Sequence, residues 1–486
     1  MADASLPGSS SGSTFESECL RISQLVQLQR ASYFQDMNPS YESRIHNLNL
    51  LKSLIVDNQS LIHDALLADF SVTPFLASQL FNMLGPISRI KYTKSNLKSW
   101  MKPRSAQVDR LMLGFASAKI HSQPLGVIGI MGAWNFPFQL TLSPLIDALA
   151  AGNKAILKPS ESAPHSAKVL HQLITQTFPP ETVSVVVGNT LDTSKAFAAQ
   201  KWDHLLYTGN AIVAREILKA AALNLVPVTL ELGGKNPVIM TEDKIDLNTI
   251  RSILATKVIN SGQFCLTADT IFVPKHCVDA FVQLAKQAYS QVLPPELNGR
   301  DQAGIINDFH FGRILNLFQE ARDASVDVID LSESREKCDP LRRTMPIHLV
   351  VDPDSDLLAS TSEIFGPGLV VRGYSQVADA VDYINARDRP LALYVYTSDK
   401  KVRDYVLNHT MSGGATVNGI YLHVAVVDAP FGGVGASGMG CYHGKEGFQT
   451  MSHQRPVFYQ FPWNAADTMN PPYKPMVSKM IAWLLQ

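Results

Sequence analysis

Apolar residues in the first part of the chain recur at the spacing of amphipathic helices. Leu48, Leu51, Leu54 and Ile55 follow one another at intervals of one helical turn or less, with polar residues between them. This periodicity is typical of helices with one buried face. We therefore expect helices over residues 15–100. Residues 102–122 instead alternate charged and apolar positions around a central glycine, which indicates a hairpin that leaves the main body.

After Pro124, short and continuous apolar runs alternate with helical patterns. The runs predict strands, and the amphipathic segments between them predict helices. The predicted strands are 127–131, 154–157, 183–187, 204–207 and 226–230, and the helices are 140–151, 163–178, 191–200 and 211–223. Such an alternation builds a parallel sheet with helices on both faces. The fold class is therefore α/β, with a doubly wound, Rossmann-like domain.

A second series of the same kind follows. Its predicted strands are about 269–273, 346–351, 368–373, 392–396 and 414–418, and its helices about 246–261, 276–292, 375–386 and 399–409. We expect a second α/β domain from this series. Two such lobes enclose a cleft between them, and ligands usually bind in clefts of this kind.

Composition and charge narrow the class of protein. Lys and Arg number 42 and Asp and Glu 43, for a formal net charge of −1, which argues against a nucleic-acid-binding protein. Hydrophobic residues make up 46% of the chain, enough for a large core. The five cysteines are widely spaced without a CxxC pair, and no HExxH occurs. We expect no metal site, no disulfide framework and a reducing, cytoplasmic location.

The two ends of the chain carry no strong targeting signal. Residues 1–14 are rich in Ser and Gly without a basic or apolar signal region, so they predict a flexible tail. Residues 480–486 are uncharged but too few to span a bilayer. Residues 474–486 leave open a short lid helix or a peripheral membrane contact.

Three turns carry candidate chemistry. Glu231 ends a predicted strand before two glycines, where parallel sheets place their sites, although a lone acid there is more often a surface residue. Cys265 lies in a glycine-containing turn, where backbone N–H groups can lower the pKa of an exposed thiol, although a buried structural thiol is the common alternative. The turn 207–210 joins a strand to a helix and suits a phosphate, or is an ordinary turn.

Six segments in fixed order then carry a family resemblance. They are Ala133-Trp-Asn-Phe-Pro137, Lys158-Pro-Ser-Glu161, Glu231-Leu-Gly-Gly-Lys235, Gly262-Gln-Phe-Cys265, Glu363-Ile-Phe-Gly-Pro367 and Pro430-Phe-Gly-Gly433. Together they resemble the NAD(P)-dependent aldehyde dehydrogenase superfamily, over roughly residues 20–460. The segment 438–444, with Ser452 and His453, resembles its class 3 branch, which includes fatty aldehyde dehydrogenases.

The resemblance implies a catalytic mechanism. Cys265 would be the nucleophile that forms a thiohemiacetal and then a thioester with the aldehyde. The Asn135 amide and the Cys265 backbone N–H would hold the oxyanion. Glu231 would be the general base for thioester hydrolysis. His443 could line the site, as the class 3 match suggests, or be a structural histidine.

The resemblance also implies a cofactor, NAD with NADP as the alternative. Lys158 and Glu161 would bind the adenosine ribose hydroxyls, and the acid at 161 favours NAD because it repels a 2′-phosphate. Gly209 and Asn210 would approach the diphosphate. Glu363 would hold the nicotinamide ribose, with Phe365 beside the nicotinamide ring.

Domains, assembly and substrate complete the expectations from sequence. Residues 15–101 and 123–233 would form the cofactor-binding domain and 234–424 the catalytic domain. Residues 102–122 and 450–466 would form a β oligomerisation layer of a homodimer, followed by a C-terminal tail, 467–486.

The aromatic residues Phe136 and Phe264 suggest a hydrophobic substrate channel, and hence a medium- or long-chain or other apolar aldehyde. Two alternatives from other classes are a cofactor-independent thiol esterase that uses Cys265 and Glu231, and a non-catalytic structural protein on the same fold.

Overall fold

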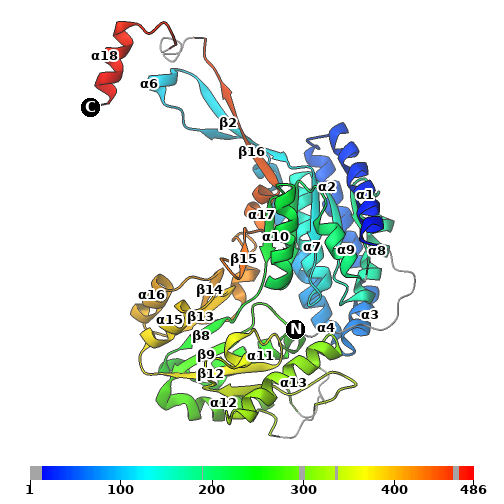
Figure 1. Cartoon of the computed structure of the whole chain (residues 1–486), viewed down its shortest axis with the longest axis vertical. Helices are drawn as coiled ribbons and strands as arrows, with labels where there is room; N and C mark the ends of the chain where they lie inside the picture. The colour runs from blue at the N-terminus through cyan, green and yellow to red at the C-terminus, as the bar shows by residue number, and fades with distance from the viewer. Residues whose placement is uncertain (1–13, 189, 295–300, 334–337, 463–469, 486) are drawn as a thin grey trace.

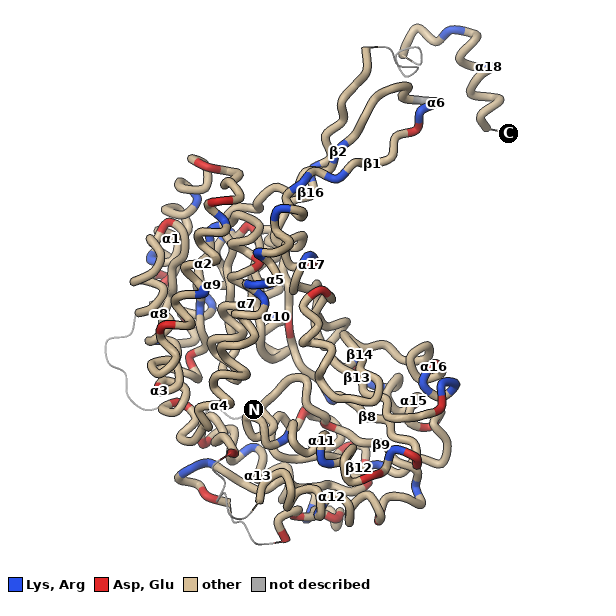
Figure 2. The backbone as a smooth tube through the Cα atoms, turned by 180° about the vertical axis from the view of Figure 1, so that it is seen from behind, with Lys and Arg blue, Asp and Glu red and all other residues tan. Residues whose placement is uncertain are grey.

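The computed structural model describes residues 14–188, 190–294, 301–333, 338–462 and 470–485. The tail predicted for residues 1–14 therefore lies almost wholly outside the described residues. Two large sheets, each covered by helices, form the body of the molecule, and a three-stranded sheet forms an arm that projects from it (Figure 1). Charged residues of both signs are spread over the body (Figure 2), as the balanced composition implies.

The N-terminal helices agree with the predicted periodicity. They are α1 (Phe15–Gln35), α2 (Tyr41–Asp57), α3 (Gln59–Phe70), α4 (Phe75–Ser78), the π-helical turn η1 (Gln79–Leu84) and α5 (Gly85–Trp100). Leu48, Leu51, Leu54 and Ile55 all lie on the buried face of α2. The side chains of Thr14 and Ser40 accept hydrogen bonds from backbone N–H groups at the starts of α1 and α2, which caps these helices.

The first large sheet has five parallel strands and one short antiparallel edge strand. The parallel strands are β3 (Val127–Met131), β4 (Lys154–Lys158), β5 (Val183–Val185), β6 (His204–Thr208) and β7 (Val228–Glu231). Its helices are α7 (Pro137–Ala151), α8 (Pro164–Thr177), α9 (Leu191–Ala198) and α10 (Ala211–Leu223). These strands and helices confirm the doubly wound prediction. The edge strand β15 (Gly438–Met439), which pairs with β7, was not predicted.

The order of the strands in this sheet, β5-β4-β3-β6-β7, reverses at β3. Ligands of doubly wound sheets bind beyond the carboxyl ends of the strands at such a reversal. The segments that follow β3, β6 and β7 therefore lie where a ligand site is expected.

The second large sheet has seven strands. They are β8 (Pro237–Met240), β9 (Thr270–Pro274), β10 (Val328–Asp330), β11 (His348–Val351), β12 (Gly368–Tyr374), β13 (Ala392–Tyr396) and β14 (Gly414–Val417), in the order β10-β11-β12-β9-β8-β13-β14. All neighbouring pairs are parallel except β10 and β11. The second α/β series is thereby confirmed, although β8 and β10 were not predicted.

The helices of this lobe are α11 (Leu247–Val258), α12 (Val278–Val292), α13 (Asp308–Asp323), α14 (Leu358–Thr361), α15 (Val377–Asn385) and α16 (Lys400–His409). Short 3₁₀ turns are η2 (Glu242–Lys244), η3 (Ile259–Gly262), η4 (Lys275–Cys277) and η6 (Leu422–Ala425). The helix predicted over 246–261 is too long at its end. It stops at Val258, because Asn260 and Ser261 adopt left-handed backbone conformations.

The arm consists of β1 (Arg104–Ala106), α6 (Arg110–Leu113), β2 (Ser117–Pro124) and β16 (Ser452–Tyr459), with β2 in the middle of the sheet. The predicted hairpin is present. Of the residues 450–466 predicted for the β layer, Ser452–Tyr459 form β16, which follows the helix α17 (Gly444–Thr450). Helix α18 (Pro475–Leu484) follows near the tip of the arm (Figure 1). In the described part of the chain, no helix has both the length and the hydrophobicity to cross a membrane.

One continuous apolar core joins the two large sheets. It includes Ile128 and Leu157 of the first sheet and Val238, Ile271 and Tyr394 of the second. The segments after β3 and before β9 therefore meet in packed protein. The division into domains at the boundaries given above remains a proposal.

Candidate active site

Cys265 lies in a turn with strained backbone geometry. Asn260, Ser261 and Gly262 have φ values of 49°, 51° and 70°, in the left-handed region. A Cβ at Gly262 would lie 2.2 Å from the carbonyl oxygen of Gly366, so a glycine is required there. The chain can thereby turn sharply between α11 and the cysteine.

The side chain of Gln263 fixes this turn. Its Nε2 donates to the carbonyl oxygens of Asn260 (2.9 Å) and Gly304 (3.1 Å), and its Oε1 accepts from the N–H of Ile306 (2.9 Å). A buried amide with all of these bonds made holds one geometry, because breaking any of them leaves a polar group unpaired.

Asn236 ties the cysteine to the neighbouring strands. Its Nδ2 donates to the carbonyl oxygens of Cys265 (2.6 Å) and Thr267 (3.0 Å), and its Oδ1 accepts from the N–H of Ala392 (2.9 Å). Asn236 itself follows Glu231 by a short glycine-containing link. The same residue therefore couples the position of the thiol to the end of β7.

The structure places Asn135 against the same turn. The residue is 4% exposed, and its Nδ2 donates to the carbonyl oxygen of Gln263 at 3.1 Å. Asn260 returns a hydrogen bond to the carbonyl oxygen of Asn135 at 2.8 Å. The segment after β3 and the cysteine turn are thus joined in both directions.

Glu231 is a buried carboxylate whose oxygens make no hydrogen bonds among the described residues. Its side chain lies at the end of β7, 2% exposed, and neither oxygen has a hydrogen-bond partner among the described residues. Burial raises the pKa of this carboxyl well above its ordinary value. Its charge is one of the causes that raise the pKa of the Cys265 thiol, after burial and the charge of Glu363.

The expectation that the turn lowers the pKa of the Cys265 thiol is wrong. The residue is partly exposed, and its pKa is raised, first by burial and then by the charges of Glu363 and Glu231. These two carboxylates come from distant parts of the sequence. A thiol in this setting needs a neighbouring base to become a thiolate.

A cavity of about 540 Å³ lies between the two sheets. It is lined by Asn210 and Ala211 at the start of α10, by Gly233 and Gly234 after β7, and by Glu363. Two of the predicted cofactor residues, Asn210 and Glu363, are therefore brought into one cavity.

The turn after β6 presents a helix N-terminus to this cavity. The Asn210 side chain accepts from the N–H of Val213 at 2.9 Å and caps α10. The N–H of Asn210 donates to the hydroxyl of Tyr207 at 3.1 Å, and the N–H of Gly209 donates to the carbonyl oxygen of Glu231 at 2.9 Å. The sequence analysis did not single out the Tyr207 hydroxyl, because its contact with the turn depends on side-chain direction.

Glu363 faces the glycine pair after β7. A Cβ at Gly233 would lie 2.3 Å from Glu363 Oε2, so a side chain at this position would displace the Glu363 carboxylate. Burial and the charge of Asp269 raise the pKa of Glu363 to about 7, against the opposing effect of the Gly234 N–H and two lysines. Phe365 lies two residues on, with its ring edge-on to Trp134 at 5.4 Å between centroids.

Lys158 and Glu161 form an ion pair at the end of β4, 2.9 Å between Nζ and Oε2. Lys158 is buried, whereas the Glu161 side chain is 43% exposed. Burial raises the pKa of Glu161, but the Lys158 charge and hydrogen bond, with a backbone N–H, outweigh this effect and lower the pKa overall. A fixed carboxylate at this edge is suited to a pair of hydroxyl groups.

These groups fit a dinucleotide. Carboxylates at positions 161 and 363 can accept hydrogen bonds from hydroxyl groups such as those of a ribose, and the N-terminus of α10 is suited to a diphosphate. The Thr208 hydroxyl, at the end of β6, is also buried without a hydrogen-bond partner among the described residues. The donor and acceptor set is therefore compatible with NAD(P).

A second cavity of about 220 Å³ adjoins Asn135. Most of its lining is apolar, with Phe81, Phe136, Val258 and Ile259 among the lining residues. The ring of Phe136 contacts those of Phe81 and Phe264, with centroids 5.9 and 5.3 Å apart. Phe264 in turn meets Tyr421 at 5.6 Å. We call these four rings the aromatic wall.

His443 is packed among aromatic rings. It is 3% exposed and stacks on Phe431 at 4.9 Å. Its backbone N–H donates to Asp147, which forms a buried ion pair with Arg89 at 2.7 Å. Burial lowers the pKa of the His443 imidazole well below its ordinary value, so the ring is neutral. Its Nδ1 is buried and has no hydrogen-bond partner among the described residues, so both interpretations of His443 stay open.

Comparisons with known proteins agree on one family. The profile of the aldehyde dehydrogenase family matches residues 33–457. The chain is 39% identical over 466 residues to a probable coniferyl aldehyde dehydrogenase of Caulobacter vibrioides, covering 95% of this chain and 96% of the relative. It is 36% identical over 443 residues to the mouse "Aldehyde dehydrogenase, dimeric NADP-preferring", covering 89% and 93% of the two chains. The solved structure of the substrate-bound state of Staphylococcus aureus AldH is similar, with a TM-score of 0.88 and 29% identity over 95% of this chain and 99% of that one.

Proposed function

This chain belongs to the aldehyde dehydrogenase family, and on that basis we propose that it oxidises hydrophobic aldehydes through an acyl-enzyme on Cys265. It is an oxidoreductase that oxidises aldehydes with NAD(P)⁺. Family membership favours this activity over the esterase and structural alternatives. The residues that perform the reaction, the kind of aldehyde and the assembly are our proposals.

The buried and unpaired carboxylate of Glu231, whose charge acts on the Cys265 thiol, is the observation that supports this assignment best. Burying a carboxyl without a hydrogen-bond partner destabilises the folded protein. A group kept in such a setting is therefore a candidate for a functional role. A carboxyl with a raised pKa is a better base near neutral pH than an ordinary glutamate. We assign Glu231 as the base that accepts a proton from the water that hydrolyses the thioester.

The proposed reaction proceeds through the thiol. The Cys265 thiolate adds to the aldehyde carbon, and the carbonyl oxygen becomes an oxyanion. NAD(P)⁺, when bound, supplies the hydride acceptor that turns this adduct into a thioester. Water then attacks the thioester while Glu231 takes the water proton, and the Cys265 sulfur leaves as thiolate.

Asn135 is the proposed donor to the oxyanion. A side-chain amide has two N–H bonds, and the contact with the carbonyl oxygen of Gln263 uses one of them. The second, with the N–H of Cys265, would point at the developing charge. One such donor is worth about 3 kcal/mol in the barrier.

Cofactor binding is assigned to the residues around the larger cavity. Lys158 and Glu161 would hold the adenosine ribose, and Glu363 the nicotinamide ribose. Gly209 and Asn210 would contact the diphosphate, and Phe365 would pack beside the nicotinamide. The position of Asn210 and Glu363 on one cavity supports this division.

The substrate is proposed to be an apolar aldehyde, with aromatic aldehydes favoured over straight chains. The aromatic wall beside Asn135 supports this choice, because offset and edge-on ring contacts favour a flat aromatic partner. The Caulobacter relative is named as acting on coniferyl aldehyde, which is itself aromatic. Medium- and long-chain aldehydes remain the second candidate class.

A panel of aldehydes tests this proposal. Each buried methylene contributes about 0.8 kcal/mol, or roughly a fourfold gain in kcat/KM. We expect kcat/KM to rise from acetaldehyde to hexanal and to be higher for benzaldehyde and cinnamaldehyde. Phe136→Ala should reduce the values for the aromatic substrates and leave that for acetaldehyde nearly unchanged. A preference for acetaldehyde, or an equal loss on all substrates, would rule the proposal out.

The assembly is proposed to be a homodimer formed through the arm. The mouse relative is named dimeric. The arm exposes strand edges on β1 and β16 and apolar rings, among them Phe458 and Tyr459 at 46% each. A second copy would cover such edges. A mass measurement at micromolar concentration should give twice 53.3 kDa, and a monomer alone would refute the dimer.

Location and the C-terminal helix complete the proposal. We propose a cytoplasmic enzyme with a peripheral role for α18, either as a cover over the substrate entrance or as a membrane contact. Exposed apolar side chains on α18, Met476, Ile481 and Trp483, support a covering or contacting role.

A further inference from the structure

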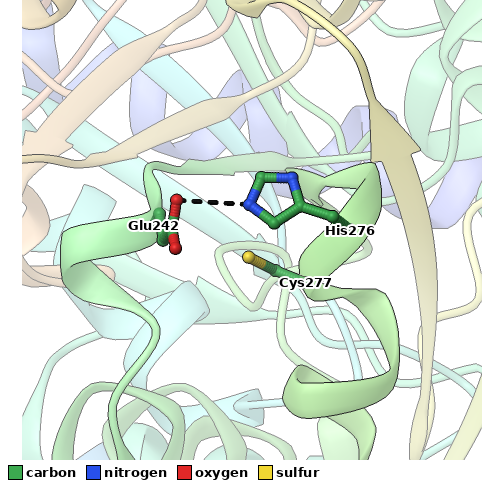
Figure 3. A group of neighbouring side chains, drawn as sticks. All are labelled: Glu242, His276 and Cys277. Atoms are coloured by element: carbon green, nitrogen blue, oxygen red, sulfur yellow. Dashed lines mark hydrogen bonds and ion pairs between the residues drawn. The ribbon is translucent and has the colours of Figure 1, made fainter.

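A second group of reactive side chains lies outside the site described above. Glu242, His276 and Cys277 come together where β8 and β9 end (Figure 3). Their potential ligand atoms all lie within 4.8 Å of one another. No other group of three such side chains at this spacing occurs among the residues that the structure describes. The proposed dehydrogenase reaction uses none of them.

We propose that Glu242, His276 and Cys277 form a binding site for a zinc-like divalent cation, with water as the fourth ligand. The set combines a carboxylate, an imidazole and a thiolate, the ligand types that Zn²⁺ prefers. Two anionic ligands would neutralise the charge of the ion. On binding, the Cys277 thiol proton passes to water and a metal–sulfur bond forms.

The distances agree with tetrahedral coordination. Zn–N and Zn–O bonds of about 2.0–2.2 Å at a tetrahedral angle place the two ligand atoms roughly 3.4 Å apart. Glu242 Oε2 and His276 Nε2 are 3.2 Å apart (Figure 3). The sulfur has to approach by at most about 1.2 Å to reach its usual separation of roughly 3.6 Å from the nitrogen. Glu242 and His276 are 72% and 69% exposed, so both side chains are free to make this adjustment.

The backbone that carries the three residues is fixed by other contacts. Asp243 accepts from the N–H of Ser398 at 3.0 Å, and the Tyr374 hydroxyl donates to the carbonyl oxygen of Met240 at 2.8 Å. On the other side, a Cβ at Gly373 would lie 3.1 Å from the Cα of Lys275, so η4 packs closely on β12. The ligands therefore project from two held turns rather than from loose loops.

The position of Cys277 adds a second argument. It is the N-cap residue of α12, a helix of 15 residues, and its side chain makes no capping hydrogen bond. Because Cys277 is only 7% exposed, the ion would sit against the protein on the sulfur side and face solvent on the other.

The proposed role of the ion is structural rather than catalytic. β8 begins just after the glycine pair of the larger cavity, and β9 begins just after the cysteine turn. The two strands are parallel neighbours, and the cation would join them at their far ends. Four or five residues of strand, about 13–16 Å, lie between this position and the starts of β8 and β9.

The sequence analysis expected no metal site because it found no spaced ligand motif. The three ligands come from two turns that only the sheet brings together. The inference depends on neither the substrate proposal nor the proposed roles of the catalytic residues.

Titration of the full chain with Co²⁺, and then with Zn²⁺ as competitor, tests the site. We expect a thiolate-to-cobalt absorption band in the wild type at one equivalent, lost in Cys277→Ser. His276→Ala and Glu242→Gln should each weaken binding about tenfold or more. Cys338→Ser, which removes an exposed cysteine elsewhere, and Cys265→Ser are the matched controls and should keep the band.

The outcomes separate this site from the active site. A band that survives Cys277→Ser, or that disappears with Cys265→Ser, would overturn the proposal. His276→Ala removes an exposed side chain and keeps the fold, so unchanged Zn²⁺ affinity in that variant would overturn it as well. Dehydrogenase activity of metal-free His276→Ala should equal that of metal-free wild type, because the ion has no part in the reaction.

Discussion

Replacing Glu231 with glutamine should stabilise the protein and slow its turnover. The carboxyl is buried without a hydrogen-bond partner, and burial raises its pKa well above the ordinary value. In the unfolded chain the same carboxyl ionises near pH 4.5. Above that pH the folded state binds more protons at this position than the unfolded state does.

The sign of the effect follows from this difference. Stability conferred by Glu231 is complete below about pH 4.5 and falls as the pH rises towards the pKa of the folded state. The loss is up to about 1.4 kcal/mol for each pH unit in that window. Glutamine does not titrate, so the variant does not lose stability in this way as the pH rises. Near pH 5, Glu231→Gln should therefore melt at the same temperature as the wild type or slightly lower. As the pH rises towards 8, the melting temperature of the variant should exceed that of the wild type by a growing margin.

Thermal unfolding scans at matched pH values measure this difference. Glu216→Gln, on the exposed face of α10, is the matched control and should follow the wild type at each pH. In rapid mixing, Glu231→Gln should release a burst of NADH and then turn over about 10²–10⁴-fold more slowly, because the general base is missing. A melting difference that is constant with pH, or equal loss of burst and steady state, would refute the reasoning.

Three further outcomes are expected. Asn236→Ala removes three hydrogen bonds around Cys265, worth about 3 kcal/mol together, so kcat and the melting temperature should fall while NAD⁺ affinity in a direct titration stays within twofold. Glu161→Gln removes a charge that would repel a 2′-phosphate by about 1 kcal/mol at 4 Å, so the kcat/KM ratio of NADP⁺ to NAD⁺ should rise about fivefold. Deleting residues 474–486 should raise KM for long aldehydes and leave KM for acetaldehyde unchanged. If the truncated and full-length enzymes have equal KM values for long aldehydes, a covering role for α18 is excluded.

Much of the fold was predictable because the hydrophobic pattern of each segment matches the way that segment is buried in the structure. The strands of the first sheet are buried on both faces, so each appears as an unbroken apolar run such as 127–131. β8 was missed because it is only four residues long and begins with a proline. The helix α13 had a usable signal, since Phe311, Ile314, Leu317 and Ala321 recur at helical spacing after the cap Asn307.

The chemistry of the site was harder to predict than its residues. The motif turns bring Asn210 and Glu363 to one cavity, but the environment of Cys265 depends on two carboxylates from other segments of the chain, Glu231 and Glu363. The contacts of Asn236 and Tyr207 likewise join segments whose approach is set by packing. The sequence shows which residues are present, but it does not show in which direction their side chains point.

Intact-protein and peptide mass spectrometry of Glu231→Gln, mixed with benzaldehyde and NAD⁺ and quenched in acid, tests the central claim most directly. The account predicts a benzoyl group on the peptide that contains Cys265, because acylation proceeds while hydrolysis is slow. The adduct should be absent in Cys265→Ser and absent without NAD⁺. An acyl group on Cys441 instead, or turnover in Cys265→Ser at a rate near that of the wild type, would contradict the account.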